Sequence, residues 1–314
     1  MTEPLVSVCI ITYNHENYIR KALDSVFVQK VNFQWEVIIA DDCSTDNTRQ
    51  IILEYKNKYP GLVKLIFQET NTRAVKNFMD LMAAPKGKYI AYLEGDDYWT
   101  DDLKLQKQFD FMESHSDFSL CYHKTSWKFM YPSAEWEKFP AESNMNDSAE
   151  YTIYDILKRG WFIRSSSMFF KSIKLPGNFE KLYIGDYPLH ILLADIGKVG
   201  FINQCMSSYR IHNQGMSETI LLVEDITQRR KNNWGEIYLN KYLNKQTNYK
   251  YDSYFKKKIF DEIYSFNHFL FFKNKWGFIK NICYTLFNFN PFFLIRQLVY
   301  KITNHNNKPI INNY

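Results

Sequence analysis

The chain has 314 residues, of which 46% are hydrophobic and 18% aromatic. This composition excludes a globally disordered protein, and the length allows one large domain or two smaller ones. The net charge of +5 is uneven: residues 1–219 carry 24 Lys+Arg and 28 Asp+Glu (−4), and residues 220–314 carry the remaining 15 and 6 (+9). A weakly acidic body with a basic, aromatic tail indicates an anionic surface as the partner of the tail.

The first hundred residues alternate between apolar runs and helical patterns. Such alternation predicts an α/β fold with a doubly wound, mostly parallel sheet. The predicted strands are residues 5–11, 35–40, 63–67 and 89–93, and the predicted helices are residues 18–28, 49–59 and 76–84.

Two of these strands end in clustered carboxylates, one in Asp41-Asp42 and the other in Glu94-Gly95-Asp96-Asp97. The carboxyl ends of parallel strands meet at one edge of a sheet, where ligands bind in open α/β folds. Hard divalent cations prefer oxygen ligands, so we expect a site for a metal and a diphosphate at this edge. The alternative is a pair of solvated turns, since Gly and Asp are ordinary turn residues.

Later segments are less regular. Residues 128–150 are polar and read as an inserted loop, residues 151–157 as a short helix, and residues 160–170 as an aromatic turn leading into a strand. Tyr183-Ile-Gly-Asp-Tyr-Pro opens an apolar helix at Asp186. A carboxylate there is commonly a helix cap, and that alternative stays open.

Four segments together resemble family 2 glycosyltransferases, which have the GT-A nucleotide-sugar-binding fold. They are Val6-Ser-Val-Cys-Ile-Ile-Thr-Tyr-Asn14, the segment 37–48, Gly87-Lys-Tyr-Ile-Ala-Tyr-Leu-Glu-Gly-Asp-Asp-Tyr-Trp99 and Lys104-Leu-Gln-Lys-Gln108. The resemblance extends with lower density to Asp186 and to Tyr209-Arg-Ile-His212. It implies a glycosyltransferase domain over residues 1–217 and leaves residues 218–314 as a helical C-terminal region.

The resemblance implies roles for several residues in binding a nucleotide-sugar donor. Tyr13 would pack on the base, with Thr12 beside it, and Asp42 would accept a hydrogen bond from the base, which favours a UDP-sugar. Asp96 would lie near the ribose, and Asp97 would ligate Mn²⁺ or Mg²⁺. Glu94 stands where many relatives have Asp and is placed outside the metal shell.

Further along the chain, the resemblance implies that Asp186 is the catalytic base, which takes a proton from the acceptor hydroxyl. It also implies that His212 contacts the metal and Arg210 the diphosphate, and imidazole is an acceptable ligand for Mn²⁺. Arg73 and Lys76 are weaker candidates for diphosphate contact, because a solvated helix face explains them equally well. Trp161 and Arg164 are candidates for contact with the acceptor sugar, and no role is assigned to His15 or the other histidines.

The C-terminal region combines aromatic residues with Lys and Arg, and 13 aromatics fall between residues 264 and 300. This mixture is typical of a helix that lies on an anionic membrane. The alternatives are that the aromatics cover the catalytic domain or form a contact between copies in a homo-oligomer. No nucleic-acid-binding motif is present, so no nucleic-acid partner is expected.

The remaining features bear on the compartment. The five cysteines form no CxxC pair, which fits a reducing cytoplasm better than a disulfide framework or a zinc site. Neither a secretory signal nor a membrane span is expected, because no charged segment followed by an apolar one opens the chain and no run of about 18 apolar residues occurs. We therefore expect a cytoplasmic protein, peripheral to the inner face of the cell membrane.

Together these observations predict an inverting, metal-dependent glycosyltransferase of cell-surface polysaccharide biosynthesis, with a glycan or lipid-linked saccharide as acceptor. The alternative from another class is a non-catalytic nucleotide-sugar-binding subunit at the membrane. A nucleotidyltransferase is less consistent, because its Gly-rich loop after the first strand is missing. A phosphatase with an Asp-x-Asp nucleophile is also less consistent, because Glu94 occupies the first position.

Overall fold

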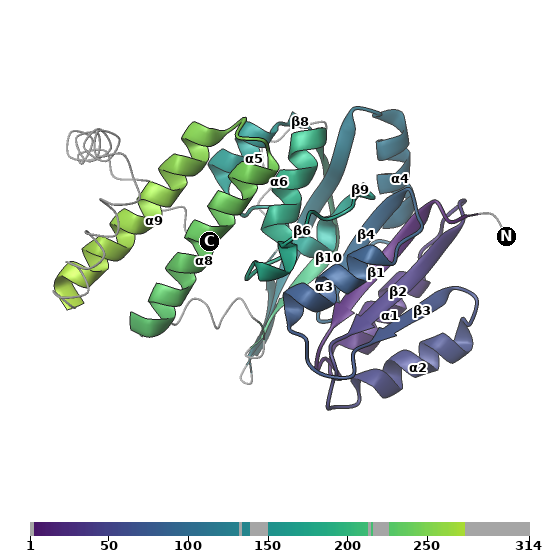
Figure 1. The fold of residues 1–314 in the computed structure, drawn as a ribbon. Helices are drawn as coiled ribbons and strands as arrows, with labels where there is room; N and C mark the ends of the chain where they lie inside the picture. The colour runs from purple at the N-terminus through teal and green to yellow at the C-terminus, as the bar shows by residue number, and fades with distance from the viewer. Residues whose placement is uncertain (1–2, 132–133, 139–149, 213–214, 216–225, 274–314) are drawn as a thin grey trace. The chain divides into compact units, whose positions relative to one another are not determined.

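The computed structural model describes residues 3–131, 134–138, 150–212, 215 and 226–273. The chain divides into two compact units, residues 1–223 and 224–314. The first unit is built on a ten-stranded sheet in the order β3-β2-β1-β4-β9-β6-β10-β5, with β7 on β6 and β8 on β10 (Figure 1).

The first half of the sheet is parallel and consists of buried apolar strands joined by helices, as the alternating pattern predicts. Parallel strands are covered on both faces, which is why these segments are apolar throughout. The strands are β1 (Val6–Thr12), β2 (Trp35–Asp41), β3 (Val63–Phe67) and β4 (Tyr89–Glu94), and the helices are α1 (Ile19–Phe27), α2 (Thr48–Lys58) and α3 (Ala74–Ala83).

The strand order reverses at β1. The chain moves outward from β1 through β2 to β3, and then returns across the sheet to place β4 on the other side of β1. Because such crossovers are right-handed, α1 and α2 cover one face of the sheet and α3 the other. The carboxyl ends of β1 and β4 therefore mark a topological switch point, the place where ligands bind in open α/β sheets.

The second half of the sheet is mixed: β9 is antiparallel to β4 and β6, and β6 and β10 are parallel. Residues 127–131 at the end of β6 pair with residues 134–138 of β7 in an antiparallel arrangement, so the predicted inserted loop is wrong over residues 128–131 and 134–138. Residues 132–133 and 139–149 lie outside the described residues. The elements are β5 (Tyr98–Trp99), α4 (Lys104–Ser114), β6 (Phe118–Tyr131), β7 (Ala134–Lys138), β8 (Glu150–Tyr151), α5 (Ile153–Arg159), η1 (Ser165–Ser167), β9 (Phe169–Lys171), η2 (Phe179–Lys181), α6 (Asp186–Ile196) and β10 (Lys198–Ile211).

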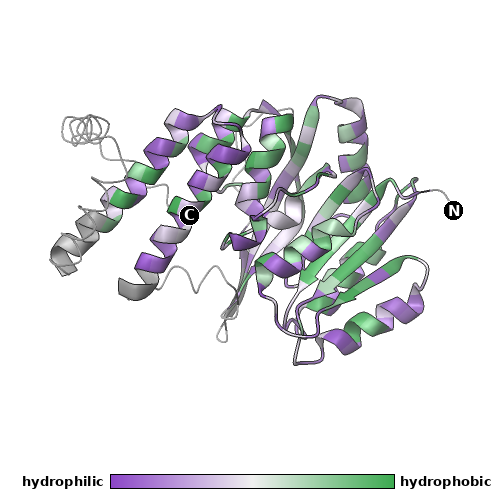
Figure 2. Cartoon of the chain, viewed as in Figure 1, coloured by the Kyte–Doolittle hydropathy of each residue, from purple (hydrophilic) through white to green (hydrophobic). Residues whose placement is uncertain are grey.

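The core of the first unit lies along the central strands. Figure 2 shows hydrophobic residues along β1, β2 and β4, and the residues of these strands are almost entirely buried. Ala22, Leu23 and Val26 of α1 are completely buried against this layer. The apolar packing fixes the strand ends, and with them the loops that follow β1 and β4.

The second unit contains two described helices, α8 (Ile226–Gln246) and α9 (Asp252–Lys273), which pack against each other. Ile237, Ile259 and Ile263 form its apolar centre. Most of the aromatic segment predicted to contact a membrane, residues 274–314, lies outside the described residues. Within the described part of the chain, no helix is both long enough and apolar enough to span a bilayer.

Candidate functional site

The loops after β1 and β4 meet at the carboxyl edge of the sheet. In the β1–β4 register Ile11 lies opposite Glu94, and the Gly95 N–H donates to the Ile11 carbonyl at 2.8 Å. A Cβ at Gly95 would lie only 2.6 Å from Thr12 Oγ1, so only glycine allows this close approach. The predicted acidic motif therefore packs directly against Thr12.

Asp96 lies between two imidazoles at this edge. Its Oδ2 is 3.2 Å from Nε2 of His212 and 3.6 Å from Nε2 of His15. Burial alone would raise the pKa of Asp96, but the two neighbouring histidines lower it below the ordinary value. Asp96 is therefore held as a carboxylate in a partly buried position, which suits a cation-binding oxygen.

Asp97 is oriented differently from Asp96. It is completely buried, and its Oδ1 accepts a hydrogen bond from the backbone N–H of Arg210 at 2.9 Å. Its Oδ2 is buried with no hydrogen-bond partner in the described structure. Burial and the neighbouring Asp96 charge raise the pKa of Asp97 well above its ordinary value. His212, the second predicted metal ligand, contacts Asp96, whereas the Asp97 carboxylate binds the backbone of β10.

The Arg210 side chain, on β10, supports the loop that contains Asp96 and Asp97. Its Nη1 donates to the backbone carbonyl of Asp96 at 2.7 Å, and its guanidinium lies over the rings of Tyr18 and Tyr98 at 5.4 and 4.6 Å. The Tyr18 ring in turn lies 4.4 Å from that of His212. Residues of β10 thus contact the loop after β4. The guanidinium of Arg210, which the sequence predicts to contact the diphosphate, here supports the backbone of Asp96.

Asp186 is the first residue of α6 and is half-buried. Its Oδ2 accepts a hydrogen bond from Nε1 of Trp161 at 3.0 Å. Burial raises the pKa of Asp186, while backbone N–H groups, Trp161 and Arg164 oppose that rise. The charge of Asp186 also helps to raise the pKa of Glu94, after burial and the charges of Asp96 and Asp97. Asp186 therefore shares its surroundings with the acidic motif.

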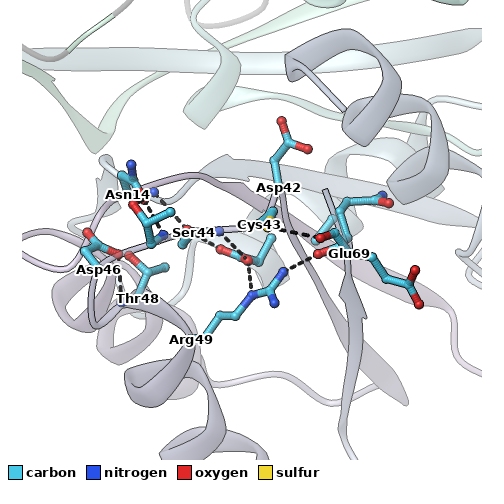
Figure 3. A network of polar contacts seen from close by, with 12 residues as sticks. Asn14, Asp42, Cys43, Ser44, Asp46, Thr48, Arg49 and Glu69 are labelled. Atoms are coloured by element: carbon cyan, nitrogen blue, oxygen red, sulfur yellow. Dashed lines mark hydrogen bonds and ion pairs between the residues drawn. The ribbon is translucent and has the colours of Figure 1, made fainter. Parts of the chain in front are cut away.

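Figure 3 shows a polar network between the loops that follow β1 and β2. Asn14 receives the Thr45 N–H on its Oδ1 at 2.8 Å, and its own N–H donates to Ser44 Oγ at 2.9 Å. Asp41 binds Arg49 and the Ser44 N–H within this network. Asp41 is thus a structural residue that holds the loop.

Asp42 points away from that network in Figure 3. Its Oδ1 accepts from the backbone N–H of Thr72 at 2.7 Å and from the Thr72 hydroxyl at 2.8 Å. The next residue, Arg73, has φ 72°, a strained conformation for a residue with a side chain. Tyr13, by contrast, is 42% exposed. Asp42 therefore fixes the loop before α3, and the exposed ring of Tyr13 follows the end of β1.

Arg73 and Lys76, the weaker candidates for diphosphate contact, have no contact with the acidic motif in the described structure. Lys76 forms an ion pair with Asp80 one turn later on α3. Arg73 is exposed, and its backbone N–H donates to Asn71. His15, which the sequence left without a role, is instead at the centre of the site. Its position directly after the β1 end, in the same loop as Thr12 and Tyr13, was the available signal.

The described part of the chain holds no group of three or more His, Cys, Asp or Glu that could bind a metal ion by itself. Asp96 and His212 nevertheless fit two positions of a shared site, since His212 presents Nε2 to Asp96 and is almost completely buried. Mg²⁺ and similar cations are often held by one or two side chains together with substrate phosphates. The arrangement suits a metal whose remaining ligands come from a bound diphosphate.

Comparison with solved structures identifies the fold. Residues 1–349 of S. aureus TarS in complex with UDP-GlcNAc superpose with a TM-score of 0.53 at 18% identity, covering 83% of this chain and 80% of that TarS chain. The mannosyltransferase PcManGT of Pyrobaculum calidifontis, in complex with GDP-Man and Mn²⁺, gives a TM-score of 0.53 at 12% identity, covering 98% of this chain and 82% of PcManGT. Both likenesses confirm the predicted GT-A fold.

Sequence comparison identifies the family. An uncharacterized protein of Mycobacterium tuberculosis is 37% identical over 216 residues, which are 67% of this chain and 60% of that longer protein. The putative teichuronic acid biosynthesis glycosyltransferase TuaG of Bacillus subtilis is 30% identical over 216 residues, 68% of this chain and 82% of TuaG. The model of glycosyl transferase family 2 matches residues 7–169. The chain belongs to glycosyl transferase family 2.

Proposed function

We propose that this chain is an inverting glycosyltransferase that moves a sugar from a nucleotide-sugar to a hydroxyl of a saccharide acceptor. The observation that carries the proposal is the convergence of Asp96, His212 and Asp186 at the switch point of a family 2 fold. Asp96 and His212 suit a metal-bound diphosphate, and Asp186 suits proton removal from the acceptor hydroxyl. A binding subunit would not need a carboxylate in the position of Asp186.

The metal site in this proposal uses Asp96 and His212; the assignment of Asp97 as a metal ligand stays a prediction and is the alternative. Asp96 presents its carboxylate to His212, whereas Oδ1 of Asp97 accepts the Arg210 N–H and its Oδ2 is buried without a hydrogen-bond partner in the described structure. The chemistry of one carboxylate and one imidazole suits Mn²⁺ or Mg²⁺. When bound, the metal would stabilise the charge of the departing nucleoside diphosphate.

Asp186 is the proposed general base. Its raised pKa makes its ionised form a stronger proton acceptor than an ordinary carboxylate, and Trp161 fixes its orientation. A positioned base contributes about 10²–10⁴-fold to such a transfer. The Asp186 carboxylate would take the proton of the acceptor hydroxyl as that oxygen attacks the anomeric carbon from the face opposite the nucleotide, which inverts the configuration.

A UDP-sugar is the proposed donor. Asp42 is an acceptor at the strand end beside Tyr13, and a uracil ring N–H is a matching donor. The complex of TarS with UDP-GlcNAc supports a uridine nucleotide, whereas the complex of PcManGT with GDP-Man supports a guanine nucleotide as the alternative. A role in cell-surface polysaccharide synthesis, with a glycan or lipid-linked acceptor, is supported by the name of TuaG.

The second unit is proposed to bind an anionic membrane through one face of α8. Between residues 230 and 245 every exposed side chain is basic or aromatic, and the spacing of three or four places them on one face. Cations mixed with Trp and Tyr are complementary to an anionic lipid surface. These residues, here called the basic face of α8, are Arg230, Lys231, Trp234, Tyr238, Lys241 and Lys245.

A donor screen tests the proposed activity. The chain is incubated with UDP- and GDP-sugars and Mn²⁺, with and without a chelator, and released nucleoside diphosphate is measured. We expect chelator-sensitive release from one or a few UDP-sugars, and inverted configuration in a product analysed by NMR. Tight binding of a UDP-sugar with no release and no transfer to any saccharide in an acceptor panel would support the non-catalytic alternative.

A further inference from the structure

His15 lies next to Asp96, in a position to orient its carboxylate. Its imidazole lies between Thr12 and Asp96, with Nδ1 3.1 Å from Thr12 Oγ1 and Nε2 3.6 Å from Asp96 Oδ2. With the proton on Nε2, the ring faces the carboxylate with its positive edge, and Nδ1 accepts the Thr12 hydroxyl proton. Thr12, His15 and Asp96 then form one polar chain from β1 to the acidic motif.

Backbone hydrogen bonds to the starts of two helices hold residue 15 in place. The N–H of His15 donates to Thr48 Oγ1 at 2.8 Å, at the start of α2. The carbonyl of His15 accepts from the N–H groups of Tyr18 and Ile19 at 2.9 and 2.8 Å, at the start of α1. The side chain is only 18% exposed. A ring fixed in this way can impose a position on its neighbours.

Gly95 shows how tightly the acidic motif packs on this ring. A Cβ at Gly95 would lie 3.0 Å from His15 Nδ1, in addition to its closer approach to Thr12. The backbone next to Asp96 therefore rests on the same two side chains that form the polar chain. Other buried histidines lie elsewhere: the rings of His190 and His123 contact Met168 and the Lys124 carbonyl.

We propose that His15 is a positioning residue that holds the Asp96 carboxylate in the orientation required for the metal and diphosphate. The inference rests on the proposed function, because it assigns Asp96 to the metal. Groups that bind a metal are themselves oriented by outer hydrogen-bonding partners, and loss of such a partner costs about 10–100-fold in metal affinity. His212 contacts the same Asp96 oxygen, so His15 fixes that oxygen from a second direction.

Two substitutions separate this role from a structural role in the loop. His15→Asn places an amide near the position of Nδ1, which keeps the contact with Thr12 and loses the contact with Asp96. His15→Gln extends an amide to the position of Nε2, which keeps the contact with Asp96. Both variants leave the backbone hydrogen bonds of residue 15 available. Circular dichroism and the melting temperature establish that each variant is folded.

The measurement is the affinity of the full chain for Mn²⁺ in the presence of UDP, followed by isothermal titration and by the EPR signal of free Mn²⁺. UDP binding with chelator present is measured in parallel. We expect His15→Asn to weaken Mn²⁺ binding by about 10–100-fold, the range for lost outer partners. His15→Gln should stay close to the parent, and metal-free UDP binding should be the same in all three proteins.

The outcomes distinguish the inference from the function on which it rests. If the folded Asn variant binds Mn²⁺ as the parent does, or the Gln variant is as weak as the Asn variant, His15 does not position Asp96. Equal loss of metal-free UDP binding would show a general loop defect and would also overturn the inference. Absence of Mn²⁺-dependent UDP binding in the parent itself would contradict the proposed function.

Discussion

At the scale of single residues, neighbouring carboxylates in one turn have different surroundings. Asp96 faces His212 and His15, whereas Asp97 accepts the Arg210 N–H and is completely buried. The chain direction changes within the turn, so two adjacent side chains of the same type leave it toward different partners. The sequence predicts that a carboxylate of this motif lies at the carboxyl edge of the sheet. The packing of the loop determines whether Asp96 or Asp97 faces His212.

This difference predicts opposite effects for matched substitutions. Asp97→Asn keeps an oxygen that can accept the Arg210 N–H, so Mn²⁺-dependent UDP binding should remain close to that of the parent. Asp96→Asn removes the proposed ligand and should weaken binding by more than about 100-fold, beyond the range for outer partners. Isothermal titration with Mn²⁺ and UDP measures both. The opposite ranking would return the metal to Asp97, as the sequence predicted.

The pH dependence of Asp186 gives a second prediction. The proposed base, Asp186, acts only when ionised, so activity should fall as the pH decreases through its pKa, which burial raises above the ordinary value of about 3.9. The Trp161 N–H stabilises the ionised form and lowers that pKa. Trp161→Phe removes the donor and keeps an aromatic ring, so the acidic limb of the rate profile should move to higher pH.

Nucleotide release from the best donor, measured across pH in the parent and in Trp161→Phe, checks this shift. Asp186→Asn serves as the reference and should lower the rate by about 10²–10⁴-fold. An acidic limb that stays at the same pH in Trp161→Phe would show that the hydrogen bond does not act on the base. Full activity in Asp186→Asn would remove the base assignment altogether.

At the scale of elements, the close packing of the loops after β1 and β4 makes Gly95 a sensitive position. Gly95→Ala places a methyl group against Thr12 Oγ1 and Cβ, at 2.6 and 2.8 Å. Such overpacking costs about 1–3 kcal/mol, so the free energy of unfolding should decrease by that amount in urea. Gly61 has open space around it, so Gly61→Ala is the matched control. Equal stability of the two variants would contradict the close packing.

The basic face of α8 gives the prediction for the second unit. Lys241→Gln with Lys245→Gln should weaken binding to phosphatidylglycerol vesicles in a sedimentation assay, most clearly at low salt, because screening weakens such attraction. Lys256→Gln with Lys257→Gln on α9 removes the same charge as a control. If both double variants bind the vesicles equally well, the basic face of α8 does not bind the membrane specifically. If the Lys241 and Lys245 pair changes only the oligomeric state, α8 forms a contact between copies.

The elements also show what sequence can and cannot predict. The strands and helices of residues 5–93 follow local apolar periodicity, and the structure places them almost as expected. The insertion of β9 between β4 and β6, and the pairing of β6 with β10, join segments far apart in the chain. No local pattern encodes such pairing. His15 was missed for the same reason, because its significance comes from the approach of Asp96 across two strands.

At the scale of the whole molecule, two units with separate cores should unfold separately when a ligand stabilises only one. The first unit contains every proposed donor residue and a large apolar core, whereas the second is centred on three isoleucines and buries Asn233, Asn240 and Asn244. Mn²⁺ with UDP at about 100 times the dissociation constant adds about 2.7 kcal/mol to the unit that binds it.

Hydrogen exchange followed by mass spectrometry measures this effect in each unit of the intact chain. Protection should increase in β1, β4 and β10 on addition of Mn²⁺ and UDP, while peptides of α8 and α9 keep their rates. Asp96→Asn is the control, and in that variant the same addition should leave the exchange of β1, β4 and β10 unchanged. A uniform increase through both units would show that the chain unfolds as one cooperative body.

The late position of β10 in the chain has a consequence for the synthesis of the protein itself. The proposed metal site takes Asp96 from the first half of the unit and His212 from directly after β10, while Arg210 of β10 supports the Asp96 backbone. A ribosome must therefore make more than two hundred residues before any of these partners can meet. An interrupted or prematurely degraded chain has β1 to β4 but lacks the strand that secures the acidic turn. Incomplete products should consequently not sequester nucleotide-sugars, because the proposed donor site requires completion of the sheet.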